Sequence, residues 1–164
     1  RTPPPPPGRA GGGGDANAAG APGTNASSAP DSVPDSAPRC LHVDDDIFVQ
    51  MTLPPRIFEP LGCAYDQASD GRQAVDMVLG RGRPYTLILI DNQMPNMTGA
   101  EATRALRDAG YTGAIVGMTG DPSGSEDRTR FEQSGLDACV DKTTDGVDFI
   151  ISEVRKRMAG DVPG

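Results

Sequence analysis

Five short apolar runs alternate along this chain with segments of helical periodicity, and this alternation limits the fold more than any other feature. Each run is long enough for one strand. The third, Thr86–Ile90, is continuously apolar or β-branched, as expected of a strand buried on both faces. The predicted strands are Cys40–Val43, Ala64–Gln67, Thr86–Ile90, Ala114–Met118 and Ala138–Val140.

The segments between and after these strands carry apolar stripes with helical spacing, of which the last is the most regular. The four stripes are Ile47, Met51 and Phe58; Ala74, Val75, Val78 and Leu79; Ala102, Ala105, Leu106 and Ala109; and Val147, Ile150, Ile151, Val154 and Met158. Alternating strands and helices predict a parallel sheet covered by helices on both faces. We therefore expect an α/β fold, a flavodoxin-like (βα)5 three-layer sandwich with strand order 2-1-3-4-5.

Local signals refine the expected helices. Thr98–Glu101 and Ser123–Glu126 both match the capping box that begins a helix. Pro54-Pro55 falls inside the first helical stripe, and because proline lacks an N–H we expect that helix to be kinked or split near Leu53. The segment 123–134 has Phe131 as its one large apolar residue, so we expect it to pack weakly and to be mobile.

Composition divides the chain into three parts. Residues 1–38 are rich in Pro, Gly, Ala and Ser, so we expect a disordered linker; residues 39–160 form one domain and residues 161–164 a short tail. The net charge of -8 argues against nucleic-acid binding. No apolar run could cross a bilayer, and three widely spaced cysteines fit a reducing compartment. We expect a cytoplasmic domain without direct membrane contact.

Polar side chains follow the predicted strands at the points where they end. Asp44 and Asp45 follow the first strand, Asp91 the third, Thr119 the fourth and Lys142 the fifth. In a parallel α/β sheet, ligands bind beyond the carboxyl ends of the strands. Three converging carboxylates need a cation, and their hard oxygen ligands suit Mg²⁺. A carboxylate beside Mg²⁺ can act as a nucleophile towards phosphorus, with the ammonium and hydroxyl groups neutralising the phosphoryl oxygens.

Each of these residues also has an ordinary structural interpretation. An Asp after a strand is most often a helix N-cap, which is the role we expect for Asp46. Thr119 on its own would be a turn residue, and Lys142 a solvated side chain. The single histidine, His42, is predicted to be a buried, hydrogen-bonded core residue, because one histidine cannot build a zinc site.

Four segments, in chain order, resemble the receiver domain of two-component signalling. Val43–Asp46 resembles the acidic pair of that family, Leu87–Gly99 its phosphorylation loop with Pro95 and Gly99, Gly117–Asp121 its hydroxyl segment and Val140–Lys142 its lysine segment. The resemblance implies that Asp91 accepts phosphate from a phosphohistidine on a histidine kinase or histidine phosphotransfer protein.

The resemblance also implies the remaining roles. Asp44, Asp45, Asp91 and the backbone carbonyl of Gln93 would hold Mg²⁺, while Thr119 and Lys142 would hold the phosphoryl group. The domain would then catalyse its own phosphorylation and slow dephosphorylation, with the side chains of Gln93 and Asp121 tuning the hydrolysis.

Three positions depart from the family pattern. Thr143 stands where a proline usually follows the lysine, Cys139 stands at the aromatic switch position, and Pro54-Pro55 interrupts the helix that often docks the phosphate donor. The first hypothesis is a phosphorylatable receiver in a phosphorelay, as the C-terminal module of a hybrid histidine kinase. The second is a degenerate receiver that acts mainly as a protein-binding module. A third, a metal-dependent phosphatase, would need a carboxylate where Gln93 stands. The sequence predicts no oligomeric state.

Overall fold

The structure, a computed structural model, describes residues 37–80 and 85–159 and contains a five-stranded parallel sheet. The predicted order, β2-β1-β3-β4-β5, is confirmed. The strands are β1 (Arg39–Val43), β2 (Ala64–Ala68), β3 (Leu87–Asp91), β4 (Ala114–Thr119) and β5 (Ala138–Asp141). The predicted linker 1–38 lies almost wholly outside the described residues, and the predicted tail 161–164 does so entirely.

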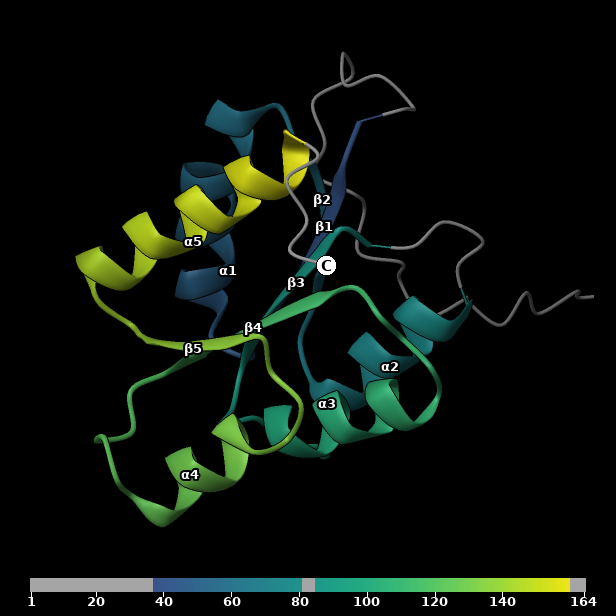
Figure 1. Cartoon of the computed structure of the whole chain (residues 1–164), viewed down its shortest axis with the longest axis vertical. Helices are drawn as coiled ribbons and strands as arrows, with labels where there is room; N and C mark the ends of the chain where they lie inside the picture. The colour runs from purple at the N-terminus through teal and green to yellow at the C-terminus, as the bar shows by residue number, and fades with distance from the viewer. Residues whose placement is uncertain (1–36, 81–84, 160–164) are drawn as a thin grey trace, which may run out of the picture.

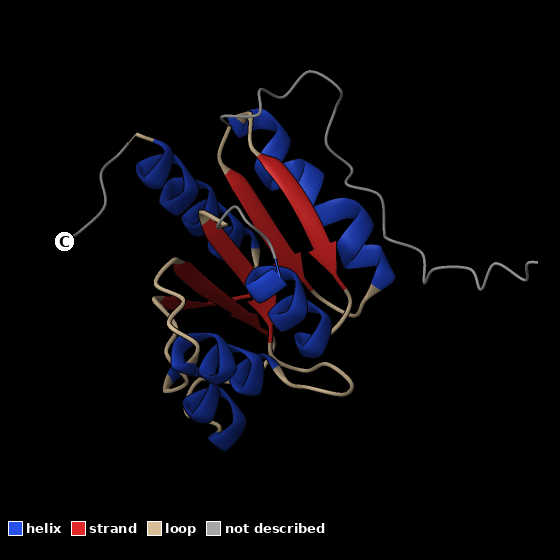
Figure 2. Cartoon of the chain, turned by 90° about the vertical axis from the view of Figure 1, so that its right-hand side faces the viewer, coloured by secondary structure: helices blue, strands red, loops and turns tan. Residues whose placement is uncertain are grey.

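Helices cover both faces of this sheet, as predicted. They are α1 (Ile47–Phe58), followed by the 3-10 turn η1 (Glu59–Leu61), then α2 (Gly71–Gly80), α3 (Gly99–Asp108), α4 (Glu126–Glu132) and α5 (Thr144–Met158). Helices α1 and α5 lie side by side on one face, and α2, α3 and α4 lie on the other (Figure 1). Figure 2 shows the strands enclosed between these two layers. In the described ranges, no helix has the length and apolar character needed to cross a membrane.

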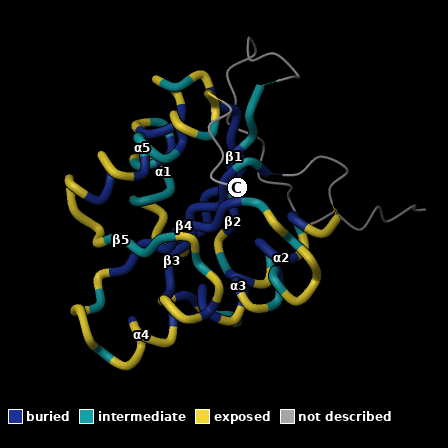
Figure 3. Tube along the Cα trace, in the orientation of Figure 1, coloured by how far each residue is buried: buried dark blue, intermediate teal, exposed yellow. Residues whose placement is uncertain are grey.

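Two apolar cores form because successive side chains of a strand point to opposite faces. In β3, Ile88 and Ile90 pack towards α2, α3 and α4, while Leu87 and Leu89 pack towards α1 and α5. All five residues of β3 are buried, and β3 lies in the dark centre of Figure 3, whereas β5 is only partly buried. Each fully buried side chain of this kind contributes about 1.5–3 kcal/mol to folding. The sheet is therefore a rigid support for the loops at its carboxyl edge.

Helix α1 corrects two predictions. It is continuous from Ile47 to Phe58 and is not split near Leu53. Pro54 has no N–H to donate to the carbonyl oxygen of Gln50 one turn earlier. That oxygen instead accepts a hydrogen bond from Nε2 of Gln67 at 3.1 Å. The predicted stripe is buried at Phe58 but 73% exposed at Ile47, so the core covers only the second half of the helix.

The two predicted capping boxes have different outcomes. At Thr98 both halves are present, since its side chain accepts from the N–H of Glu101 and the Glu101 carboxylate accepts from the N–H of Thr98. The prediction at Ser123 is wrong: Ser125 caps α4, accepting from the N–H of Arg128 at 3.3 Å. The expected mobility of segment 123–134 stays a prediction.

Candidate functional site

Strand register brings the polar residues together at one edge of the sheet. Val43 lies opposite Ile90 in the β1–β3 pair, so the next residues lie side by side, Asp44 directly after β1 and Asp91 at the end of β3. Thr119 is the last residue of β4, and the backbone N–H of Lys142 donates to its carbonyl at 3.1 Å. The predicted convergence of carboxylates, hydroxyl and ammonium at this edge therefore follows from the pairing of the strands.

Asp44 is a buried carboxylate that is hydrogen-bonded through both oxygens. Its Oδ1 accepts from the backbone N–H of Asp46 at 2.9 Å, and its Oδ2 lies 3.1 Å from Nζ of Lys142. Asp46 in turn caps α1, as predicted, accepting from the N–H groups of Phe48 and Val49. The start of α1 thus orients the carboxylate of Asp44.

Asp91 is 6% exposed, and its Oδ1 lies 3.0 Å from Nζ of Lys142. Burial raises the pKa of Asp91 from 3.8 to about 6, because a charge is costly to remove from water. The Lys142 ammonium opposes this rise in pKa, and the nearby charge of Asp44 adds to it. The carboxylate of Asp91 is therefore ionised at neutral pH, although the effect of burial on its pKa exceeds the opposing effect of Lys142.

Lys142 is the cation that pairs with both buried carboxylates. Burial lowers the pKa of Lys142, but its hydrogen bonds and ion pairs with Asp91 and Asp44 outweigh burial and leave that pKa above its ordinary value. The ammonium is therefore held charged at the carboxyl edge of the sheet. Thr143, which follows it in place of a proline, caps α5 by accepting from the N–H of Gly146 at 3.3 Å.

Asp45 completes the acidic cluster. It is exposed, unlike Asp44 and Asp91, yet one carboxylate oxygen from each of the three residues lies within 4.8 Å of the others. Three hard, anionic oxygen donors at this spacing fit a divalent cation such as Mg²⁺. The side chain of Gln93 is exposed and does not join this cluster of carboxylates. Its Nε2 donates to Oδ2 of Asp121 at 3.4 Å.

The hydroxyl of Thr119 is at the predicted edge but is engaged by Asp121. Thr119 is fully buried; its Oγ1 donates to Oδ2 of Asp121 and accepts from the N–H of Asp121, both at 3.0 Å. Gly120, between them, has open space where a Cβ would stand.

Two residues beside Asp91 have structural roles that the sequence analysis did not predict. The side chain of Asn92 is buried and accepts from the N–H of Ala100 at 3.2 Å, which ties the loop to the start of α3. A Cβ at Gly99 would lie well inside van der Waals contact with the carbonyl oxygen of Asp91. Close packing against Asp91 therefore requires glycine at position 99. For Asn92, the sequence signal was an asparagine directly after a strand.

His42 and Arg128 also differ from simple expectation. His42 is buried as predicted, but its Nδ1 finds no hydrogen-bond partner within the described residues. Burial, followed by the charge of Lys142, lowers the pKa of His42 to about 3, so the ring is neutral. Arg128 is buried on α4 and bonds to the carbonyl of Asp121; nothing in the local sequence marks it as more than a surface residue of a helix.

Comparison with known proteins agrees with this geometry. A family model described as the response regulator receiver domain matches residues 40–152. Two-component response regulator 24 of Arabidopsis thaliana is 36% identical over 100 residues, which are 61% of this chain and 70% of that protein. Two-component response regulator ORR42 of Oryza sativa is 31% identical over 115 residues, 69% of this chain and 84% of that protein.

Solved structures share the fold. The receiver domain of a sensor histidine kinase from Pseudomonas aeruginosa, determined with a magnesium ion coordinated in its active site cleft, superimposes with a TM-score of 0.64 at 24% identity. That match covers 76% of this chain and 99% of the other. The matched residues 40–152 contain the whole acidic cluster together with Thr119 and Lys142. This chain is a two-component signalling protein that belongs to the response regulator receiver domain family.

Proposed function

We propose that Asp91 accepts a phosphoryl group from a phosphohistidine on a histidine kinase or histidine phosphotransfer protein, in a Mg²⁺-dependent reaction, and that the domain acts as a switch in a phosphorelay. The observation that carries this proposal is the cluster of Asp44, Asp45 and Asp91, whose oxygens lie within 4.8 Å of one another beside Lys142. Three carboxylates and one ammonium form an arrangement that is suited to phosphoryl transfer.

In the proposed reaction, a carboxylate oxygen of Asp91 attacks phosphorus. A P–O bond forms, the P–N bond to the donor histidine breaks, and the imidazole leaves with the electron pair and takes up a proton. The nucleophile must be ionised, which the pKa of about 6 allows at neutral pH. Lys142 is placed to pair with the new phosphoryl oxygens, because its ammonium already lies 3.0 Å from Asp91.

Magnesium would be held by the carboxylates of Asp44, Asp45 and Asp91 and by the backbone carbonyl of Gln93. When bound, it would supply positive charge to the phosphoryl oxygens. Thr119 would donate its hydroxyl proton to one of those oxygens. The slow loss of the phosphoryl group to water is proposed as a second reaction of the same residues, with Gln93 and Asp121 tuning access because their side chains meet beside the site.

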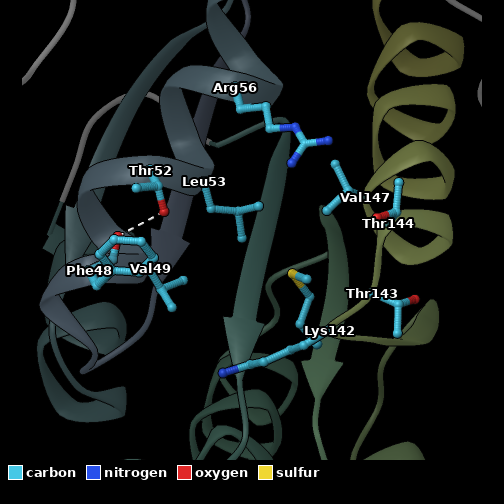
Figure 4. Close-up of a pocket in the computed structure, with 10 residues that line it drawn as sticks. Phe48, Val49, Thr52, Leu53, Arg56, Lys142, Thr143, Thr144 and Val147 are labelled. Carbon is cyan, nitrogen blue, oxygen red and sulfur yellow. Dashed lines mark hydrogen bonds between the residues drawn. The ribbon is translucent and has the colours of Figure 1, made fainter.

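The first turns of α1 are the proposed docking face for the phosphate donor. Ile47, Phe48 and Met51 are more than 70% exposed there. Beside them, a groove of about 360 Å³ runs between α1 and α5 and reaches Lys142 at one end (Figure 4). An apolar surface next to the reacting carboxylate would orient a donor helix that carries the phosphohistidine.

The placement of this domain in a hybrid histidine kinase stays a prediction. Plant response regulators match the chain over most of their own length, so a donor on a separate protein fits the same observations. The donor chemistry, a phosphohistidine, is common to both arrangements.

A receiver that acts mainly as a protein-binding module is the second candidate. The exposed face of α1 and the adjoining groove exist independently of the acidic cluster, and they would bind a partner without any transfer of phosphate. Cys139 in place of the family's aromatic switch residue also favours this candidate, because rotation of an aromatic ring is not available for output.

The decisive experiment is incubation with acetyl phosphate and Mg²⁺, followed by intact-protein mass spectrometry. We expect one added phosphoryl group, lost in Asp91→Asn and retained in the control variant Asp108→Asn, whose residue ends α3 away from the cluster. Absence of both the adduct and Mg²⁺ binding would support the binding module. Rapid turnover of small phosphate esters would support a phosphatase instead.

A further inference from the structure

Arg128 connects helix α4 to the loop that follows β4. Its side chain is 9% exposed, an unusual position for an arginine on a helix of seven residues. Its Nη1 donates to the backbone carbonyl of Asp121 at 3.1 Å and also bonds to the carboxylate of Asp141, while its Nε pairs with Glu132 at 2.9 Å. One guanidinium group therefore joins α4, the loop after β4 and the end of β5.

Asp121 links this guanidinium group to the candidate site. The residue that offers its carbonyl to Arg128 also accepts the hydroxyl proton of Thr119 on its own carboxylate, at 3.0 Å, and returns a backbone N–H to the same hydroxyl. From Thr119 through Asp121 to Arg128, each step is a direct hydrogen bond. Gly120 alone separates Thr119 from Asp121, so one end of this turn cannot move independently of the other.

The hydroxyl of Thr119 has one proton to donate. As long as Asp121 accepts it, no phosphoryl oxygen on Asp91 can. Donation to a phosphoryl group would break the bond to Oδ2 of Asp121, whose remaining side-chain donor is Nε2 of Gln93 at 3.4 Å. The turn would then relax, and the carbonyl that holds Arg128 would shift with it.

Helix α4 is poised to respond because it has few other attachments. Arg128 and Phe131 are its two buried residues. Phe131 packs against Gly117 in β4, where a Cβ would lie 2.6 Å from the ring, and so provides the apolar half of the attachment. Arg128 provides the polar half, through acceptors that lie outside the helix.

We propose that Arg128 is a positioning residue that couples phosphorylation of Asp91 to the position of α4, acting through Asp121 and Thr119. This inference rests on the proposed function. Cys139 has no aromatic ring that could rotate, so in this proposal the ionic contact of Arg128 provides the coupling. Before phosphorylation Arg128 holds α4 against the loop, and that hold is released when the Thr119 hydroxyl donates its hydrogen bond to the phosphoryl group instead of to Asp121.

Hydrogen exchange of the α4 amides, measured before and after treatment with acetyl phosphate and Mg²⁺, tests the coupling. In the wild type we expect faster exchange in α4 after phosphorylation, by a factor of about five or more, the lower end of couplings between sites. In Arg128→Met, α4 should exchange at the fast rate before treatment and change little afterwards. Arg130→Met is the matched control, because Arg130 lies on the same helix and pairs with exposed Glu126 and Asp127.

Two further variants separate coupling from loss of structure. In Thr119→Ala, the molecules that carry the phosphoryl group, counted by intact mass, should show no change in α4 exchange. Asp141→Asn, at a side chain that is 59% exposed and so should not endanger folding, removes a negative charge that pairs with Arg128 and should reduce the change. Amides of β3 report global unfolding in every variant, so a misfolded Arg128→Met protein would be recognised. In that case the result for Asp141→Asn decides whether Arg128 couples phosphorylation to α4.

The outcomes are distinguishable. If the phosphoryl adduct forms and Arg128→Met or Thr119→Ala keeps the full wild-type change in α4, the coupling is wrong while the proposed function stands. An adduct without any change in wild-type α4 overturns the coupling in the same way. If no adduct forms in the wild type, the proposed function fails and the coupling fails with it.

Discussion

The ammonium group of Lys142 lies 3.0 Å from a carboxylate oxygen of Asp91, so the residue directly after the last strand supplies the cation for a buried acid at the end of the central strand. The hydrogen bond and charge of Lys142 hold the pKa of Asp91 down against the effect of burial. We expect Lys142→Met to raise the pKa of Asp91 above its present value of about 6. Carboxyl carbon chemical shifts, followed by NMR across a pH titration, would measure it.

Lys156→Met is the control for that titration, because Lys156 forms an exposed pair with Glu153 on α5 and does not contact the cluster. The pKa of Asp91 should be the same in this control as in the wild type. An unchanged pKa in Lys142→Met would mean that the ion pair does not compensate the buried charge.

The raised pKa of Asp91 predicts a stability cost above pH 6. Between pH 3.8 and about 6 the folded state binds the Asp91 proton more tightly than the unfolded state, so this group lowers the free energy of unfolding as pH rises. Above that range the whole cost is present. Asp91→Asn should therefore raise the free energy of unfolding at pH 7.5 by up to about 3 kcal/mol, and by little near pH 4.

Urea denaturation of the two proteins at both pH values checks this prediction. Asp46→Asn is a suitable control, since Asp46 is exposed and asparagine caps a helix about as well as aspartate. Equal free energies of unfolding of the wild type and Asp91→Asn at pH 7.5 would show that the buried charge of Asp91 does not destabilise the folded state.

Binding of Mg²⁺ should offset the stability that is lost by burying the charge of Asp91. A cation that binds only the folded state stabilises it by mass action, by about 2.7 kcal/mol at a concentration one hundred times its dissociation constant. Because protonated Asp91 is a poor ligand, the rise in melting temperature should be larger at pH 7.5 than at pH 5. Differential scanning fluorimetry with Mg²⁺ measures the rise, and Asp45→Asn, which removes the exposed member of the cluster, should reduce it.

Gly99 offers a test of the loop that carries Asp91. A Cβ at this position would collide with the backbone of Asp91 and Asn92, so Gly99→Ala should lower the free energy of unfolding by about 1–3 kcal/mol and displace the acidic cluster. In the control Gly120→Ala a Cβ meets open space, and we expect a change within about 0.5 kcal/mol. Similar losses in both variants, measured by urea denaturation, would argue against tight packing beneath Asp91.

The sheet and the carboxylate cluster could be predicted from the sequence because both depend on short-range patterns. Apolar runs such as Leu87–Ile90 mark the strands, and polar residues directly after them must emerge at the carboxyl edge. Once β1 and β3 are neighbours, Asp44 and Asp91 have to meet.

What the sequence did not reveal depends on partners that are distant along the chain. Arg128 looks like a surface residue until the fold brings the Asp121 carbonyl and the Asp141 carboxylate to its guanidinium group. Likewise, Thr119 was placed at the correct edge, but the partner of its hydroxyl depends on how the next turn folds. Such contacts are set by tertiary packing and have no local signature.

Helix α1 is continuous at Leu53, where a split was one of the two expected outcomes, and a distant partner is again the reason. Pro54 deprives the carbonyl of Gln50 of its helical donor, and Gln67 in β2 supplies a replacement at 3.1 Å. Gln67→Ala should lower the free energy of unfolding by about 1 kcal/mol. In a Pro54→Ala background, where a backbone N–H can again donate to Gln50, the same change should cost less. A double-mutant cycle by urea denaturation measures this difference. Equal costs in the two backgrounds would show that the Gln67 amide does not compensate for the proline, and that α1 tolerates Pro54 by other means.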